Sequence, residues 1–236
     1  SLLFSAFESW MVSEHRYQAF PEHLLGQTFA FAASGNGIGA ILAGLLAQRS
    51  ADILGDIGPF QLAIAITILV LILVCFWREN YGTSHDIQNQ SDSVFSQFYK
   101  ASQLVFKSPA MLCVGLSQAF FEGAVYSFVF MWVPSMIAVT DTLPTGLVFS
   151  CFMLAMTAGG LLTSILLTLF PNSTENVCNL AYLLSALCVC VPIIQFEFTP
   201  IFASFLMLEA MVGVFNSAGA MLRSEYYPEG EQASII

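Results

Sequence analysis

Charged residues are scarce in this sequence. Asp, Glu, Lys and Arg together account for 9% of its 236 residues, and only 6 of these charged residues are basic. A soluble domain usually contains about 25% charged residues, whereas 57% of this chain is hydrophobic. The composition therefore excludes an ordinary soluble domain and indicates an integral membrane protein. Because the net charge is −10, the chain offers no basis for binding nucleic acid or anionic lipid.

The residue patterns that build metal sites and catalytic centres are also missing. The 6 cysteines include no C-x-x-C pair and no histidine partner at metal-ligand spacing, so we interpret them as small hydrophobic residues. The three histidines, His15, His23 and His85, fall in connections between apolar segments. No serine has the surroundings of a nucleophile elbow. We therefore expect no resident metal, no cofactor and no enzymatic activity.

One short motif matches a dinucleotide-binding fingerprint. Residues 35–40, GNGIGA, have the form G-x-G-x-x-A, and Asp56 follows about 20 residues later. No strand precedes the motif, and its glycines lie in the middle of an apolar segment rather than at the start of a helix. We interpret the small residues as a surface for close helix packing in lipid, with Asn36 as the one strongly polar side chain of this segment.

Apolar runs long enough to cross a bilayer recur along the chain. About 20 residues span the hydrocarbon core as a helix, and the runs at this scale are 24–47, 60–77, 109–138, 147–170, 177–194 and 200–222. Residues 1–12 resemble the last turns of another span. We therefore expect an all-α, polytopic transmembrane helix bundle with about six complete spans and one partial span. The chain has no initiating Met or visible signal peptide, so we expect an internal piece of a longer membrane protein.

A polar stretch divides the chain into two parts. Residues 83–96 form the longest polar run, and residues 94–106 have the spacing of a short amphipathic helix at the interface or of a solvated extension of the next span. We therefore expect the end of an N-terminal helical half (residues 1–82), a central loop (83–107) and an incomplete C-terminal half (108–236).

The distribution of basic residues predicts that this central loop is cytosolic. If the connections alternate sides, five of the six basic residues share the side of the loop, and only Arg49 lies on the other side. Two N-x-[ST] sequons, at Asn89 and Asn172, lie on the same side and argue against this orientation. The charge asymmetry carries more weight, because such triplets are common by chance.

The segment from Gly115 to Pro134 places polar side chains inside apolar sequence. On a helix Gln118, Glu122 and Tyr126 share one face, because they are four residues apart. An ionisable residue near the middle of the bilayer is costly, so the default hypothesis is a pathway, proton relay or binding site that includes Glu122. The alternative is a neutral Glu122 that is hydrogen-bonded to a neighbouring helix and only supports packing.

The last span repeats this pattern. Within residues 200–222, Glu209, Gly213, Asn216 and Ala220 follow one another at helical spacing and form a stripe with a carboxyl group at depth. We therefore treat Glu209 and Asn216 as candidate site residues together with those of the Gly115–Pro134 segment.

Several short motifs occur in a fixed order along the chain. They are Phe7-Glu8-Ser9-Trp10 followed by Glu14-His15, then Glu79-Asn80-Tyr81, Gln118-Ala119-Phe120-Phe121-Glu122, Phe130-Met131-Trp132-Val133-Pro134, and Leu222-Arg223 with Pro228-Glu229-Gly230-Glu231-Gln232. Together they resemble the molybdate-anion transporter family of the major facilitator superfamily. The resemblance covers essentially the whole chain.

This resemblance implies a partial major facilitator fold, in which twelve helices form two halves. Residues 1–12 would belong to the fourth helix, and Glu122 and Glu209 to the seventh and tenth. In this superfamily helices one, four, seven and ten line a central cavity, so Glu8, Glu122 and Glu209 would converge there. The connection at residues 171–176 lacks the gating pattern often found after the eighth helix, so no gating residue is assigned.

The resemblance also implies a function: a secondary-active transporter of the plasma membrane that imports molybdate by alternating access. Alternatives are transport of a sugar-like or cationic solute, or a non-transporting membrane scaffold. We expect Glu122 and Glu209 to couple transport to protons. The expected polar lining of the cavity is Gln118, Asn36, Tyr126 and Asn216. Because the apolar runs contain no basic residue, we expect the cations that bind the anion on helices outside this chain. The sequence does not indicate an oligomeric state.

Overall fold

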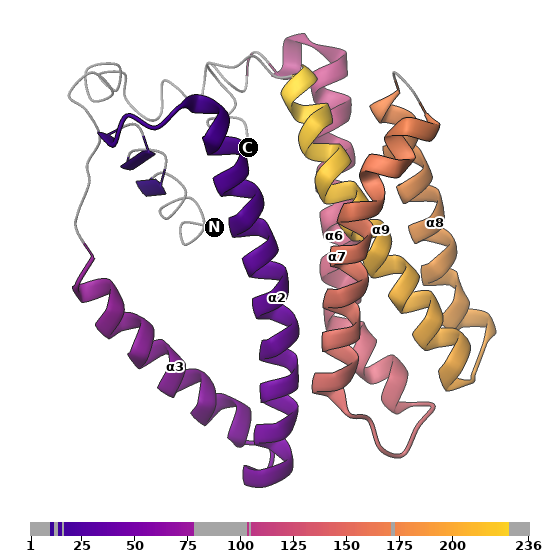
Figure 1. Ribbon diagram of the computed structural model, residues 1–236. Helices are drawn as coiled ribbons and strands as arrows, with labels where there is room; N and C mark the ends of the chain where they lie inside the picture. Colours follow the sequence, from indigo (N-terminus) through magenta and orange to yellow (C-terminus); the bar gives the residue numbers. More distant parts are fainter. Residues whose placement is uncertain are drawn as a thin grey trace.

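The structure, a computed structural model, describes residues 10–11, 14–15, 17–77, 103, 105–170 and 173–226 (Figure 1). Within these residues there are six long helices and no strand: α2 (Glu22–Leu54), α3 (Gly58–Cys75), α6 (Pro109–Ile137), α7 (Thr145–Leu169), α8 (Thr174–Ile194) and α9 (Phe198–Tyr226). Each contains a stretch long and apolar enough to cross a membrane. The predicted all-α polytopic bundle is confirmed. The partial span at residues 1–12 and the polar loop at 83–96 fall almost wholly outside the described residues.

Local sequence signals set the helix ends. α6 begins at Pro109, and the side chain of Ser108 accepts a hydrogen bond of 3.5 Å from the backbone N–H of Met111. α2 continues to Leu54, beyond the predicted apolar run at 24–47, so the connection to α3 is only residues 55–57. It starts at Gly55, whose φ of 75° lies in the left-handed region that glycine adopts at low cost.

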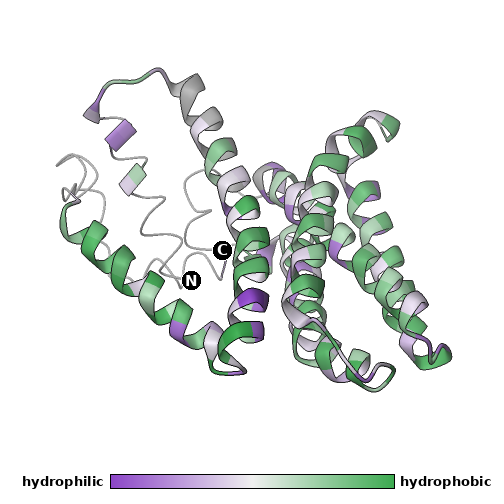
Figure 2. Ribbon diagram, turned by 60° about the horizontal axis from the view of Figure 1, so that its bottom comes forward, coloured by the Kyte–Doolittle hydropathy of each residue, from purple (hydrophilic) through white to green (hydrophobic). Residues whose placement is uncertain are grey.

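α9 is the centre of the bundle. It packs against α7, α8 and α6, and it is the most buried of the six candidate spans. α2 packs against α7 on the outer side of this group, and α3 leaves the end of α2 at an angle (Figure 1). Figure 2 shows that α3 is hydrophobic along most of its length, as expected for a helix surrounded by lipid or by other apolar helices.

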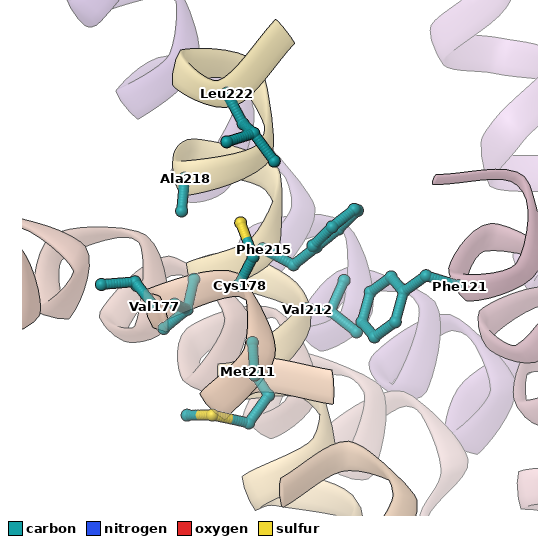
Figure 3. Close-up of a cluster of buried hydrophobic side chains, with 10 residues drawn as sticks. Phe121, Val177, Cys178, Met211, Val212, Phe215, Ala218 and Leu222 are labelled. Atoms are coloured by element: carbon teal, nitrogen blue, oxygen red, sulfur yellow. The ribbon is translucent and has the colours of Figure 1, made fainter. Parts of the chain in front are cut away.

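The core between α6, α7, α8 and α9 contains two clusters of buried side chains. One of them, which includes Phe121 and Phe215, is shown in Figure 3. The ring centroids of Phe121 and Phe215 are 4.3 Å apart, and those of Phe128 and Phe205 are 5.0 Å apart. Phe121 and Phe128 are seven residues apart and lie on the same face of α6. Their burial against α9 fixes the rotation of α6.

α2 and α7 meet through small residues. Gly37 faces Thr157, and a β-carbon on Gly37 would lie 3.0 Å from the hydroxyl oxygen of that side chain. Closer to the end of α2, the backbone of Gly146 lies directly against Gly44. Within the GNGIGA motif only Gly37 therefore lies at a close helix contact, whereas a β-carbon on Gly35 or Gly39 would meet nothing within 4 Å.

Candidate functional site

The polar face of α6 contains a side-chain hydrogen bond near the middle of the helix. The amide Nε2 of Gln118 donates to Oε1 of Glu122, one turn further along. Glu122 is exposed, and 65% of the surface of Tyr126 is exposed on the next turn. With Phe121 and Phe128 turned into the core, this polar face is left on the open side of α6. The hydrogen-bond partner of Glu122 within the described residues is on its own helix, whereas the packing alternative requires a partner on a neighbouring helix.

Arg223 of α9 extends this row of side chains. Its NH1 donates a hydrogen bond of 2.6 Å to Oε1 of Gln118, so the amide of Gln118 lies between the guanidinium group and Glu122. Gln118 is nine residues from the start of α6, or about 13 Å along its axis. The apolar run predicted at residues 200–222 contains no basic residue, but Arg223 directly follows it, and the apolar span of α9 ends at Arg223. Because helical side chains point towards the N-terminus of their helix, an arginine at the end of a span can reach into it.

Among the residues that the structure describes, Glu209 is the buried carboxyl group. Only 6% of its surface is exposed, and its side chain makes no hydrogen bond to another residue of the described chain. Burial of a carboxyl group without a partner is costly, which makes Glu209 a candidate functional residue. The stripe that contains it does not face a cavity along its whole length, since Gly213 packs against α7. Asn216, one turn beyond, is exposed.

The remaining predicted residues are not joined to these groups. Asn36 is exposed on α2, on the far side of α7 from α9. Glu8 lies outside the described residues. No side-chain hydrogen bond between described residues connects Glu209, Asn36 or Asn216 with the Gln118–Glu122 pair. Their convergence on one central cavity therefore stays a prediction.

A groove between α6 and α8 is lined by other residues. Its volume is about 500 Å³, and its walls include Phe121, Val125, Tyr182 and Val189, with Leu208 of α9 also in contact with it. No predicted site residue lines this groove. Its mostly apolar walls suit a lipid chain or a helix better than an ion.

A second polar contact ties the end of α9 to the start of α8. The hydroxyl group of Tyr226 donates a hydrogen bond of 2.8 Å to Oε1 of Glu175. This bond raises the pKa of Tyr226 above its ordinary value, and the negative charge of Glu175 acts in the same direction. Lys107 lies just before α6, and Arg223 lies in the last turn of α9. The start of α6 and the end of α9 are at one end of the bundle, whereas Arg49 is near the C-terminal end of α2, at the other end of the bundle (Figure 1). Arg16, Arg78 and Lys100 lie outside the described residues, so the predicted orientation stays a prediction.

Side chains that could bind a metal are not clustered in the described part of the chain. Among the described residues, no set of three or more His, Cys, Asp or Glu side chains could hold a metal ion.

A protein-family model described as sugar transporters with 12 TM segments matches residues 1–217. The chain belongs to this family, within the major facilitator superfamily. The similarity to this superfamily extends over the described helices and over residues 1–9, which the structure does not describe.

Curated members of the superfamily with similar sequences are named molybdate-anion transporters. The protein of Xenopus tropicalis is 33% identical over 254 residues, which cover 100% of this chain and 52% of the relative. The protein of Takifugu rubripes is 28% identical over 268 residues, which cover 100% of this chain and 54% of the relative. These relatives confirm the family resemblance found in the motifs, and they are named as transporters rather than as enzymes. The chain spans about half the length of the curated relatives that it matches. No solved structure matches it.

Proposed function

We propose that the full-length protein is a secondary-active transporter that imports molybdate by alternating access. The names of the relatives support the substrate, and the division of the spans supports the mechanism. α2 and α3 precede the central polar loop, α6 to α9 follow it, and the two groups meet where α2 packs on α7. The observation that carries the proposal is the presence of two carboxyl groups, Glu122 and Glu209, inside membrane-spanning helices.

In this proposal Glu122 and Glu209 take up and release the coupling protons. Glu122 is accessible from outside the bundle, whereas Glu209 is enclosed. No other Asp, Glu, Lys, Arg or His occurs in α6, and α7 contains none. α8 packs against α9 and contributes three titratable side chains there: Glu175, Cys178 and Tyr182. We propose Gln118, Asn36, Tyr126 and Asn216 as polar residues of the substrate cavity, and Glu8 as a third carboxyl group there.

The test is uptake of labelled molybdate by the full-length protein in a host that lacks its own carrier. We expect uptake that depends on external pH, and we expect Glu122→Gln to abolish this dependence while the protein still folds. Glu197→Gln is the matched control, because Glu197 is exposed in the connection between α8 and α9. Glu209→Gln should also lose the dependence. Unchanged pH profiles in both variants would reject the coupling role, and absence of uptake by the wild-type protein would reject molybdate as the substrate.

A sugar-like solute is the second candidate, because the matching family model is described as sugar transporters. The protein should then take up a labelled sugar. An excess of unlabelled sugar should inhibit this uptake, whereas molybdate should not. Uptake of a cationic solute would likewise not be inhibited by molybdate. A non-transporting scaffold would give no flux of any solute into reconstituted vesicles.

We further propose a plasma-membrane location with the central loop, residues 83–107, on the cytosolic side. The grouping of Lys107 and Arg223 at one end of the bundle supports this orientation. Glycan attached to Asn89 in the native protein would reverse it.

A further inference from the structure

Arg223 carries a charge that the described part of the chain does not neutralise. It is half-buried in the last turn of α9, and its hydrogen-bond partner is the neutral amide oxygen of Gln118, at 2.6 Å. No carboxylate of the described residues forms an ion pair with it. Glu175 instead accepts a hydrogen bond from the hydroxyl group of Tyr226, and Glu225 is exposed. A guanidinium group has five N–H donors, and Gln118 is the acceptor for one of them, so most of the donors of Arg223 have no acceptor within the described residues.

Two neighbours hold the guanidinium group inside the end of the bundle. It folds back along α9, and a β-carbon on Gly219 would lie 3.5 Å from NH1. This is an ordinary van der Waals distance, so a single β-carbon would fit there and only a larger, branched side chain at position 219 would displace the guanidinium group. On the other side, Gln118 anchors NH1 and at the same time donates its own amide N–H to Glu122. The amide of Gln118 therefore keeps the carboxylate of Glu122 and the guanidinium group apart.

We propose that Arg223 is the cationic ligand for a tetrahedral oxyanion, with Gln118 and Gly219 as positioning residues. The inference rests on the proposed function and makes it more specific, since it places a binding cation within this chain. Molybdate is a tetrahedral dianion with oxygen atoms that can accept two parallel N–H donors from one guanidinium group. An ion pair with Glu122 would use those donors, and the intervening amide prevents it.

The first experiment uses the wild-type full-length protein. Phenylglyoxal modifies accessible guanidinium groups, and mass spectrometry locates the modified arginines. Saturating molybdate, or the isosteric tungstate, should slow modification of Arg223 and leave that of Arg49 unchanged. Arg49 is the internal control, because it is exposed near the C-terminal end of α2. Equal modification of Arg223 with and without either anion, in a protein that transports molybdate, overturns the inference and leaves the proposed function standing.

The second experiment measures uptake kinetics of variants. We expect Arg223→Gln to raise KM for molybdate by about tenfold or more, the change that loss of a charge-assisted hydrogen bond produces. Arg223→Lys should restore part of the affinity, and Arg49→Gln should leave KM unchanged. Gly219→Val should raise KM by displacing the guanidinium group, whereas Gly123→Val is the matched control because nothing lies within 4 Å of a β-carbon there.

A purely structural role gives a different result. Arg223→Gln would then lower the amount of folded protein and the maximal rate, with KM unchanged, and that outcome overturns the inference. Thermal unfolding supplies a readout that does not depend on transport, since molybdate should stabilise the wild-type protein and not Arg223→Gln. A wild-type protein that neither transports nor is stabilised by molybdate overturns the inference together with the proposed substrate.

Discussion

The backbone of Gly213 on α9 lies against the carbonyl oxygen of Met156 on α7. A β-carbon at position 213 would overlap that oxygen, and one at Gly159 of α7 would overlap the carbonyl oxygen of Ala210 in the same way. The two helices therefore touch backbone to backbone at two successive points. Small residues permit such contact, and in a membrane it is a main source of helix association.

This contact predicts a sharp difference between glycines. Gly213→Val and Gly159→Val should each lower the unfolding temperature, because overpacking at such a site costs about 1–3 kcal/mol. Gly35→Val and Gly123→Val introduce the same side chain where nothing lies within 4 Å of a β-carbon, so they should have little effect. Thermal unfolding of the purified full-length protein in detergent measures all four variants. Similar losses at all four positions would show that α7 and α9 are not in this contact.

The hydrogen bond between Tyr226 and Glu175 predicts a dependence on pH. Because the bond raises the pKa of Tyr226 above its ordinary value of 10, the protonated hydroxyl group is stabilised in the folded state. The stabilising effect is therefore fully present below pH 10 and is lost as the pH rises through the raised pKa. Tyr226→Phe should lower the unfolding temperature near neutral pH, and the difference from the wild type should shrink above pH 10.

The control for this prediction is Tyr126→Phe. Tyr126 is exposed, and no hydrogen bond of its hydroxyl group to another described residue is present. Its substitution should therefore leave the unfolding temperature unchanged across the same range of pH. A constant difference between Tyr226→Phe and the wild type at all pH values would contradict the assigned bond.

Two buried serines should respond differently to loss of their hydroxyl groups. Ser150 of α7 donates to the carbonyl oxygen of Ile41 on α2, at 3.0 Å, so Ser150→Ala should destabilise the protein by about 0.5–1 kcal/mol. Ser185 of α8 is equally buried, and its hydroxyl group has no partner in the described part of the protein. Ser185→Ala should therefore be neutral or slightly stabilising, and a loss equal to that of Ser150→Ala would point to an acceptor for Ser185.

The contact between α2 and α7 predicts that a crosslink will stop transport. Oε1 of Gln48 accepts a hydrogen bond of 2.9 Å from the backbone N–H of Gly146, which caps the first turn of α7. Further along the same contact, a β-carbon on Gly37 of α2 would lie 3.9 Å from that of Thr157 on α7, which is within the range of a disulfide, so cysteines at these two positions should form one. If α2 and α7 must separate during alternating access, oxidation of G37C/T157C should abolish uptake and reductant should restore it.

This experiment needs a background in which other cysteines cannot interfere. Cys75, Cys113, Cys151 and Cys190 are exposed and should be replaced by serine first. The variant with Thr157→Cys alone is the matched control and should transport under oxidising conditions. Full transport by the crosslinked double variant would mean that α2 and α7 do not separate at this contact.

The spans were predictable because the bilayer fixes their length. The run expected at 109–138 corresponds to α6, Pro109–Ile137, with its proline at the first helical position. The end of α2 was predicted too early, since Gln48, Arg49 and Asp52 are polar and suggest a turn. The helix continues because Gln48 donates to Asp52 one turn later, at 2.9 Å, and accepts from Gly146 of α7. Only the second of these contacts depends on a distant part of the chain.

The site was predictable only where its parts lie on one helix. The spacing of Gln118 and Glu122 places them on one face of α6, and the structure joins them by a hydrogen bond. The contact of Gln118 with Arg223 spans 105 positions and depends on how α6 and α9 pack, which spacing within one helix does not indicate. For the same reason the small residues around Glu209 did not reveal that Gly213 faces α7.

The uneven surroundings of α2 and α3 also affect how the chain enters the bilayer. α3 is the most apolar of the six spans and has little contact with anything but α2, whereas the glycine-rich α2 is the least apolar. During synthesis α3 is therefore apolar enough to insert into the bilayer by itself. Because the connection at Gly55 is short, α2 and α3 then insert together as a helical hairpin. α7, which begins 90 residues after Gly55, is synthesised later and then packs against α2.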